Sequence, residues 1–361
     1  MSKKQVRLEY LDGLRGAAAI LVSVVHYLMV VKSEGMVAAW EAPFVTLFTE
    51  YFDLGKIGVV IFFAISGFII PSSFKSGVSK KASVKKFFIS RVFRLYPVYW
   101  FSIPLGLWAF WIIQEKDFSV SIVFANFTML QQFVGVKNII GVYWTLQVEI
   151  IFYVLCVMLF LLGKLNDRCF SFYCSIAALV VAILMSYLRG ALEVKLPVAV
   201  PLALSVMFFG GLWRELTLNK DSEAGQFCII YLIFFFVSMP IISVFAYNLD
   251  MGWGETWYRY LISYYSAITL FCLMTSKYKL VGPVFSYLGR VSYSYYLLHP
   301  VCIVFVVDVA LPFFGCFPES GLFVVLGTII LAMMLSSLTY SFIEKPSIKV
   351  GRVIAERRLG V

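Results

Sequence analysis

The sequence predicts an all-α integral membrane protein with about ten transmembrane helices, and three observations support this fold class. First, 61% of the 361 residues are hydrophobic and only 14% are charged, whereas soluble domains carry about 25% charged residues. Second, apolar runs long enough to cross a hydrocarbon core about 30 Å thick recur along the chain. Third, the basic residues fall mainly in the short stretches between those runs. Lipid must therefore be the solvent for much of this surface.

A membrane-spanning helix needs roughly 20 apolar residues, and ten segments come close to this length. In chain order they are 11–31, 56–73, 96–113, 143–162, 170–188, 197–213, 227–246, 258–276, 291–310 and 321–343. Residues 119–134 are apolar but short, so we expect a re-entrant or interfacial piece there. No internal repeat is evident, and we expect residues 1–361 to form a single transmembrane domain.

The distribution of lysine and arginine predicts the orientation of these helices. If the chain crosses the membrane at each of the ten segments, 23 basic residues fall on the side of the amino terminus and 7 on the other. Cytoplasmic loops of membrane proteins carry the excess of Lys and Arg. We therefore expect both termini of this multi-pass protein to be cytoplasmic.

The net charge of +10 does not indicate nucleic-acid binding, because the positive charge borders apolar runs and suits anionic lipid. We expect membrane lipid as a partner and no nucleic acid. The sequence has no phosphate-binding Walker loop, no HExxH motif and no cysteine–histidine cluster. We therefore expect no metal and no permanently bound cofactor.

Ionisable side chains inside a membrane are costly and usually face a cavity or a partner. The first predicted helix contains three of them, Asp12, Arg15 and His26. At 100° per residue, Arg15 and His26 lie on one face about 16 Å apart along the axis, and Asp12 lies within about 40° of His26. The three side chains form one polar stripe. An alternative is that Asp12 and Arg15 mark the membrane boundary and His26 is a buried, hydrogen-bonded ring.

Only one other histidine occurs, His299, and it also falls in a predicted span. Ser292, Tyr296 and His299 share a helical face because they follow the spacing i, i+4, i+7. Pro300 comes directly after His299 and disturbs the following turn. For His299 we favour a role in helix packing over direct chemistry.

Two further spans carry polar or small residues at membrane depth. Glu149 lies too deep in its helix to reach water easily and should pair with a cation such as Arg15 or with His26. A purely structural ion pair is the alternative for this carboxylate. Ser66 and Gly67 lie deep in the second span, where a ligand could approach the backbone. Trp144 is a plausible interfacial anchor.

The basic segment 74–97 predicts an amphipathic helix on the cytoplasmic surface. Arg91 and Arg94 are three residues apart on one face, at the mouth of the third span. Attraction to lipid headgroups explains the lysines of this segment. For the two arginines, a polyanionic ligand is an equally good explanation, because guanidinium binds phosphate in a bidentate manner.

Taken together, these segments resemble the acyltransferase-3 family of membrane acyltransferases, which includes bacterial polysaccharide and Nod-factor O-acetyltransferases. Six motifs carry the resemblance from residue 11 to residue 346, in the family's order. They are LDGLRG (11–16), GKIGVVIFFAISGF (55–68), RVFRLYP (91–97), WTLQVEIIFY (144–153), LGRVSYSYYLLH (288–299) and FIEKP (342–346). The ten-helix topology is also similar to that of the family. Some relatives carry an additional carboxy-terminal SGNH domain, which we do not expect here.

The resemblance implies an acyl-CoA donor from the cytoplasm, acetyl-CoA by default, and a saccharide hydroxyl as acceptor. It matches the family's arginine and histidine to Arg15 and His26, and its paired arginines to Arg91 and Arg94. The expected catalytic residues are His26, Arg15, Glu149 and Asp12. The expected substrate-binding residues are Arg91, Arg94, Ser66, Gly67, Trp144, Tyr153, Tyr293 and His299.

These expectations lead to a mechanistic hypothesis. Arg91 and Arg94 hold the CoA phosphates, and the thioester lies in a cavity bounded by the first, second and fourth spans. His26 is a general base on the acceptor hydroxyl or, in a variant, carries the acyl group covalently. Arg15 binds the donor or stabilises charge at the thioester oxygen. The alternative function is a transporter or flippase for a lipid-linked sugar, which would transfer no acyl group. The sequence does not indicate an oligomeric state.

Overall fold

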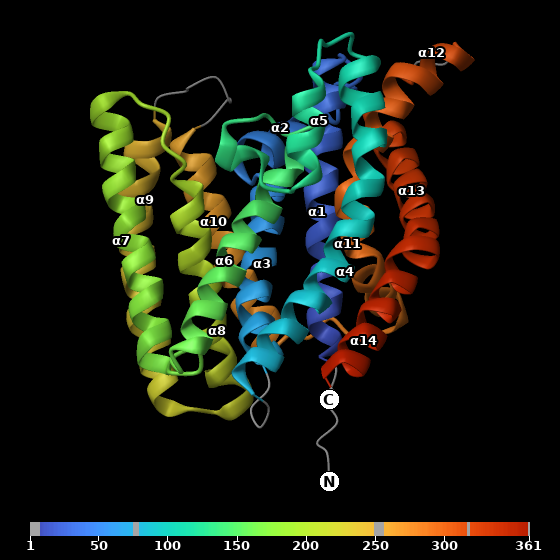
Figure 1. Ribbon diagram of the computed structural model, residues 1–361. Coiled ribbons are helices and arrows are strands. Elements are labelled where there is room, and N and C mark those ends of the chain that lie inside the picture. Colours follow the sequence, from blue (N-terminus) through green and yellow to red (C-terminus); the bar gives the residue numbers. More distant parts are fainter. Residues whose placement is uncertain (1–7, 75–78, 249–255, 316–317, 360–361) are drawn as a thin grey trace.

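The computed structural model describes residues 8–74, 79–248, 256–315 and 318–359, and within these ranges it contains helices and no strand. The α-helices are α1 (Glu9–Ser33), α2 (Ala42–Thr46), α3 (Leu54–Ile69), α4 (Lys80–Leu107), α5 (Val120–Phe127), α6 (Trp144–Leu161), α7 (Arg168–Leu192), α8 (Ala199–Asn219), α9 (Ser222–Tyr247), α10 (Trp257–Ser276), α11 (Pro283–Val304), α12 (Leu311–Phe314), α13 (Gly321–Thr339) and α14 (Lys345–Leu359). The long helices run side by side in one bundle (Figure 1). The all-α fold class is confirmed.

Short π-helical turns extend several of these helices without a break. They are Leu47–Tyr51 after α2, Trp108–Ile112 after α4, Phe305–Ala310 after α11 and Tyr340–Glu344 between α13 and α14. Single 3₁₀ turns occupy Ile70–Ser73, Gln131–Val134 and Gly141–Tyr143. The last two belong to the segment between α4 and α6 that also holds the eight-residue helix α5, which is too short to span a membrane.

Nine helices in the described ranges are long and apolar enough to cross a membrane. They match nine of the ten predicted spans. The remaining predicted span, 258–276, corresponds to the helix α10. This helix is 20 residues long but is not among those nine. Its first half is rich in tyrosine and serine, and Tyr260, Ser263 and Tyr264 are buried against the bundle. The polar groups that lower its apolarity therefore face protein rather than lipid.

The bundle has two ends, which we call proximal and distal. The proximal end holds the start of α1 and the end of α14, and the distal end holds α2 and α12 (Figure 1). A chain whose first and last helices meet at the same end must cross an even number of times. Together, the nine apolar helices and α10 meet this condition. The assignment of the proximal end to the cytoplasm stays a prediction.

The basic amphipathic segment and the third span are one helix in the structure. α4 continues for 28 residues from Lys80, although Pro97 and Pro104 lie inside it. Each proline removes a backbone hydrogen bond, which weakens and bends a helix without necessarily ending it. The first half of α4 slants across the proximal end of the bundle (Figure 1). This continuity connects the basic residues of the segment directly to the interior of the bundle.

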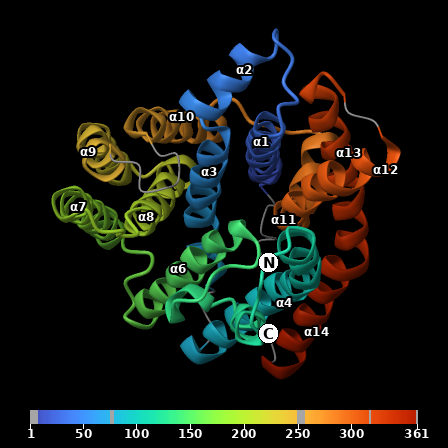
Figure 2. The ribbon, with the colours of Figure 1, turned by 90° about the horizontal axis from the view of Figure 1, so that it is seen from above.

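Close contacts between α1 and its neighbours fix the centre of the bundle. α1 lies between α3 and α11 (Figure 2). A Cβ atom on Gly289 of α11 would overlap the backbone of Asp12, and small residues of this kind let membrane helices approach closely. Asp12, Arg15 and His26 lie on one side of α1 and are partly accessible. Ala17 and Val24 lie on the opposite side and are partly accessible as well. The predicted polar stripe thus exists, separate from an apolar one.

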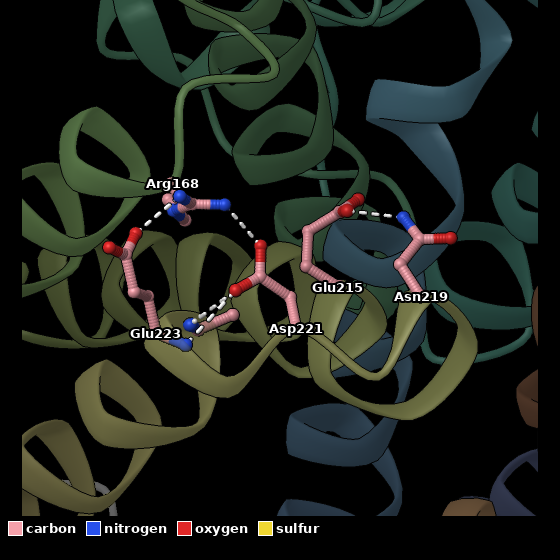
Figure 3. A network of polar contacts seen from close by, with 6 residues as sticks. Arg168, Glu215, Asn219, Asp221 and Glu223 are labelled. Atoms are coloured by element: carbon pink, nitrogen blue, oxygen red, sulfur yellow. Dashed lines mark hydrogen bonds and ion pairs between the residues drawn. The ribbon is translucent and has the colours of Figure 1, made fainter.

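At the proximal end, an ion-pair network connects the starts of α7 and α9 (Figure 3). Arg168 pairs with Asp221 and Glu223, and Asp221 caps α9 by accepting hydrogen bonds from two backbone N–H groups. Glu215 accepts a hydrogen bond from Asn219 at the end of α8. Arg168 and Glu223 are exposed and Asp221 is partly exposed, so solvent screens these ion pairs and the network contributes little to stability.

Candidate functional site

A cavity with an open mouth lies between five helices. Side chains of α1, α3, α4, α6 and α11 line it. The sequence predicted a cavity bounded by the first, second and fourth spans, and the structure adds α4 and α11. Six predicted site residues line this cavity: Arg15, Ser66, Arg94, Glu149, Tyr153 and Tyr293.

Two arginines give the cavity its positive charge. Arg15 reaches it from α1 and Arg94 from α4, and both side chains are half-buried. Neither guanidinium makes a hydrogen bond or an ion pair with any residue that the structure describes. A charged group that is partly removed from water without such partners is costly. An anionic ligand that accepts hydrogen bonds from both arginines would offset this cost.

Two carboxylates near the cavity are held by serines from other helices. Ser66 donates a hydrogen bond to Glu149 over 3.2 Å. Ser294 donates to Glu344 over 2.6 Å, and Glu344 is only 2% exposed. The charges of Glu149 and Glu344 reach the arginines only at longer range, because neither carboxylate forms a direct ion pair with a described residue. The guanidinium N–H donors are therefore left for a ligand.

Glu344 is not among the predicted site residues. It ends the π-helical turn Tyr340–Glu344, between α13 and α14. The sequence does carry a signal for it, because Glu344 is the carboxylate of the FIEKP motif at the end of the last apolar run. An acidic residue at that place indicates a buried functional or structural role as strongly as Glu149 does.

Arg91 lies outside the cavity. Its Nη2 donates to Ser73 over 3.0 Å, and its guanidinium lies over the rings of Phe87 and Tyr153, at 5.3 Å and 5.5 Å from their centroids. Cation–π contacts of this kind stabilise an arginine in place. The three-residue spacing therefore brings only Arg94 to the cavity, and Arg91 lies beside it next to Tyr153.

The two histidines form a direct pair. His26 Nδ1 lies 2.9 Å from His299 Nε2, and the two rings are stacked with an interplanar angle of 12°. His299 Nδ1 lies 2.8 Å from the carbonyl oxygen of Tyr296. In addition to the packing that the sequence predicts for His299, its side chain contacts the other histidine directly.

The hydrogen bonds of this pair assign the protons of both neutral rings. A carbonyl oxygen only accepts, so His299 must carry its proton on Nδ1 and leave Nε2 as an acceptor. His26 must then donate from Nδ1, which leaves the lone pair of His26 Nε2 without a described partner. A neutral imidazole held in one tautomer by a second group is the usual arrangement of a general base.

Tyrosines surround the histidine pair and connect it to the cavity. Tyr27 donates a hydrogen bond to the carbonyl oxygen of His299 over 3.1 Å, and the ring of Tyr295 stacks near His299. Tyr296 lines the cavity, and its hydroxyl lies 3.0 Å from Thr145. Because the carbonyl of Tyr296 also binds His299, this residue borders both places. Neither histidine is itself among the cavity-lining residues.

The remaining predicted site residues lie in helix contacts. Asp12 is at the seam between α1 and α11, where Gly289 meets its backbone. Gly67 faces α8, and a Cβ atom there would overlap the carbonyl oxygen of Met207. The ring of Trp144 packs edge-on against Phe63. None of the three lines the cavity. In the described parts of the chain, no three His, Cys, Asp or Glu side chains gather as they would around a metal ion.

Comparison with known proteins identifies one family. A family model described as an acyltransferase domain matches residues 8–341. This match covers every helix of the bundle from α1 to α13 and includes Arg15, Arg94 and both histidines. No curated protein and no solved structure matches the chain.

Proposed function

This chain belongs to the acyltransferase-3 family of membrane acyltransferases, and on that premise we propose that it moves an acyl group from cytoplasmic acyl-CoA to a hydroxyl of a saccharide. The saccharide is at the cell surface or linked to lipid, and acetyl is the acyl group that we expect first. The membrane is the inner membrane of a bacterium. One observation carries the proposal: the ordered pair His26–His299 lies next to a cavity with two arginines that no described side chain neutralises directly.

Arg15 and Arg94 are the donor-binding residues of this proposal. CoA presents several phosphate oxygens, and two guanidinium groups without partners among the described residues bind such oxygens through charge-assisted hydrogen bonds. Arg94 lies on the helix that begins with the basic residues of the proximal end. A donor that enters from the cytoplasm would meet the basic residues at the start of α4 first.

His26 is the base. Its Nε2 lone pair accepts the proton of the acceptor hydroxyl while the hydroxyl oxygen attacks the thioester carbon. The C–S bond then breaks, and the CoA sulfur leaves and takes the proton back from His26. His299 keeps Nδ1 of His26 protonated, so that Nε2 of His26 is the nitrogen that accepts the proton. General-base catalysis of this kind contributes typically about 10²–10⁴-fold.

Transfer of label tests the proposal. Purified protein in vesicles is given radiolabelled acetyl-CoA and membrane glycans, and the glycan is assayed for the label. We expect wild-type protein to label the glycan, and His26→Ala and Arg15→Ala to fall to background while keeping the wild-type melting temperature. Wild-type transfer by both folded variants would contradict the mechanism. A transporter or flippase would move its cargo and leave the glycan without label.

A further inference from the structure

A short helix at the distal end buries polar side chains and exposes apolar ones. We call residues 40–52 the strap: they contain α2 and the π-helical turn Leu47–Tyr51. Helices of a folded domain normally turn their apolar face inward. In the strap, Glu41 and Thr49 are turned inward and buried, together with Val45.

The outward face of the strap is a stripe of large apolar side chains. Trp40, Phe44, Leu47 and Tyr51 are spaced four, three and four residues apart, which places them on one side of a helix. Trp40 is 61% exposed and Phe44 is 60% exposed, whereas Glu41 is 5% exposed. A shallow hollow lies on this face, lined in part by Leu47 and Tyr51.

The strap lies across the bundle rather than along it. In the view down the bundle, α1 is seen end-on while α2 runs across the picture at the outer edge (Figure 2). In the side view, α2 lies toward the distal end (Figure 1). A helix at this level and in this direction runs parallel to the plane of a bilayer that the long helices cross.

Both ends of the strap are fixed to long helices of the bundle. Glu41 accepts hydrogen bonds from the backbone N–H groups of Gly321 and Leu322 and from the hydroxyl of Ser320, and so caps the start of α13. At the other end, the ring of Tyr51 stacks on Tyr258 of α10, with centroids 5.4 Å apart. These contacts leave the direction of the outward stripe little freedom.

Exposed apolar side chains also lie near the starts of the two helices to which the strap is fixed. Phe323, Leu326 and Ile330 are exposed on α13, directly below the residues that Glu41 caps. Trp257 is exposed at the start of α10, beside the Tyr51–Tyr258 stack. A stripe of large apolar side chains that is fixed between these two helices fits the same solvent as their exposed apolar side chains.

We propose that the strap is an interfacial helix that rests in the distal leaflet, with Trp40, Phe44, Leu47 and Tyr51 inserted among phospholipid acyl chains just below the headgroups. Helices of this type bury their apolar face about 5–10 Å into the boundary between headgroups and acyl chains. Tryptophan and tyrosine are the residues enriched at that depth. The inward hydrogen bonds of Glu41 then fasten the lipid-facing helix to the bundle.

Fluorescence quenching tests this placement. Full-length protein is reconstituted in phosphatidylcholine vesicles whose acyl chains carry bromine either near the headgroup or near the methyl end. The emission of Trp40 is obtained as the difference between wild-type protein and Trp40→Phe. We expect the Trp40 emission to be lost mainly with bromine near the headgroup, and to be insensitive to iodide in water.

A second probe separates lipid contact from a local effect of Trp40. In the Trp40→Phe background, Phe44→Trp moves the indole one turn along the stripe, and its emission should be quenched by the same shallow bromines. Glu34→Trp, in the exposed turn before the strap, is the control and should respond to iodide. If iodide but not brominated lipid quenches both the Trp40 emission and the emission added by Phe44→Trp, the proposal is overturned. Protection that requires added glycan or a higher protein density in the vesicle would overturn it as well.

Discussion

His26 Nδ1 and His299 Nε2 lie 2.9 Å apart, and this contact determines which nitrogen of His26 carries the proton. We expect His299→Phe to fold, because phenylalanine keeps a flat aromatic ring at this position, and to lose the acceptor for His26 Nδ1. His26 would then be free to adopt the wrong tautomer, and kcat should fall about 10²-fold or more. Steady-state kinetics with acyl-CoA should show an unchanged donor KM.

Tyr27→Phe is the matched control for this prediction. It removes the hydrogen bond from Tyr27 to the carbonyl oxygen of His299 but leaves the contact between the two rings. We expect a loss of stability of about 1 kcal/mol and little change in kcat. If Tyr27→Phe lowered kcat as much as His299→Phe, the effect would come from packing and not from the tautomer of His26.

The two arginines of α4 should behave differently. Arg94 lines the cavity without a partner among the described residues, whereas Arg91 is held by Ser73 and two aromatic rings. We therefore expect Arg94→Ala to raise the KM for acyl-CoA about tenfold or more, as for the loss of one charge-assisted contact of about 1.5–3 kcal/mol. Binding of CoA to the wild type should also weaken as salt is added.

Arg91→Ala should instead lower the melting temperature and change the donor KM less. The measurement is a comparison of donor KM and thermal unfolding for both variants in the same detergent. An equal rise of KM in the two variants would mean that both arginines contact the donor, as their spacing in the sequence suggests.

At this scale, the sequence indicates residues but not their partners. The cost of charge in a membrane predicts Arg15 and Glu149 as site residues, and the cavity does contain both. The pairing of His26 with His299 was not predictable, because 273 positions separate the two residues and helical periodicity describes only neighbours on one helix. Whether α3 turns Gly67 toward a ligand or toward α8 likewise depends on the tertiary contact with Met207.

At the scale of single helices, the start of α3 depends on a buried carboxylate. Asp53 caps the helix by accepting from the backbone N–H of Lys56, and it also pairs with the side chains of Lys56 and Arg259. Burial alone would raise the pKa of Asp53, but the two cations and the hydrogen bonds hold it below the ordinary value. The folded state therefore favours the ionised carboxylate.

This shift predicts how stability responds to acid. Because the pKa of Asp53 is lower in the folded state, its contribution is complete above the unfolded pKa of about 3.9 and is lost as the pH falls further toward the folded value. Asp53→Asn should destabilise the protein by about 3 kcal/mol at neutral pH, since it leaves Arg259 and Lys56 with less compensation. In melting temperatures measured from pH 7 down to the acid limit of the detergent, the difference between the two proteins should begin to shrink below about pH 4.

The contact between α3 and α8 gives a second prediction for single helices. Gly67→Ala would push a Cβ atom into the carbonyl oxygen of Met207 and should cost about 1–3 kcal/mol. Gly327→Ala on α13 is the control, because nothing lies within 4 Å of a Cβ atom there, and it should leave the melting temperature unchanged or slightly higher. Equal losses in the two variants would show that α3 and α8 do not touch at Gly67.

Helix positions were predictable from the sequence more accurately than helix ends. Apolar length placed all the long helices, because a span must be apolar for about 20 residues whatever its neighbours are. The unbroken course of α4 through Pro97 was not expected, since proline more often ends a helix. The apolarity of α10 was overestimated, because its tyrosines count as hydrophobic in composition while their hydroxyls lower its hydropathy.

For the whole molecule, the helix ends alternate between the proximal and distal ends (Figure 1), and 23 of the 30 basic residues belong to the side of the amino terminus. We expect a green fluorescent protein fused after residue 361 to fluoresce in living cells, because we predict that this side faces the cytoplasm. Alkaline phosphatase fused after Tyr247, at the end of α9, should be active outside. An inactive phosphatase at that place together with an active one at residue 361 would reverse the orientation.

The separation of Arg15 and His26 on one face of α1 is a distance that the donor has to bridge. Eleven helical residues extend about 16 Å, so a molecule held by its phosphates at Arg15 delivers its acyl carbon to His26 only through a long flexible arm. CoA has such an arm between its phosphates and its thioester. Acetyl phosphate and acetyl adenylate, in which the acyl group is bonded directly to phosphate, are too short to occupy both places. The length of a single stretch of helix would thereby exclude activated acyl compounds that the chemistry at His26 alone could not reject.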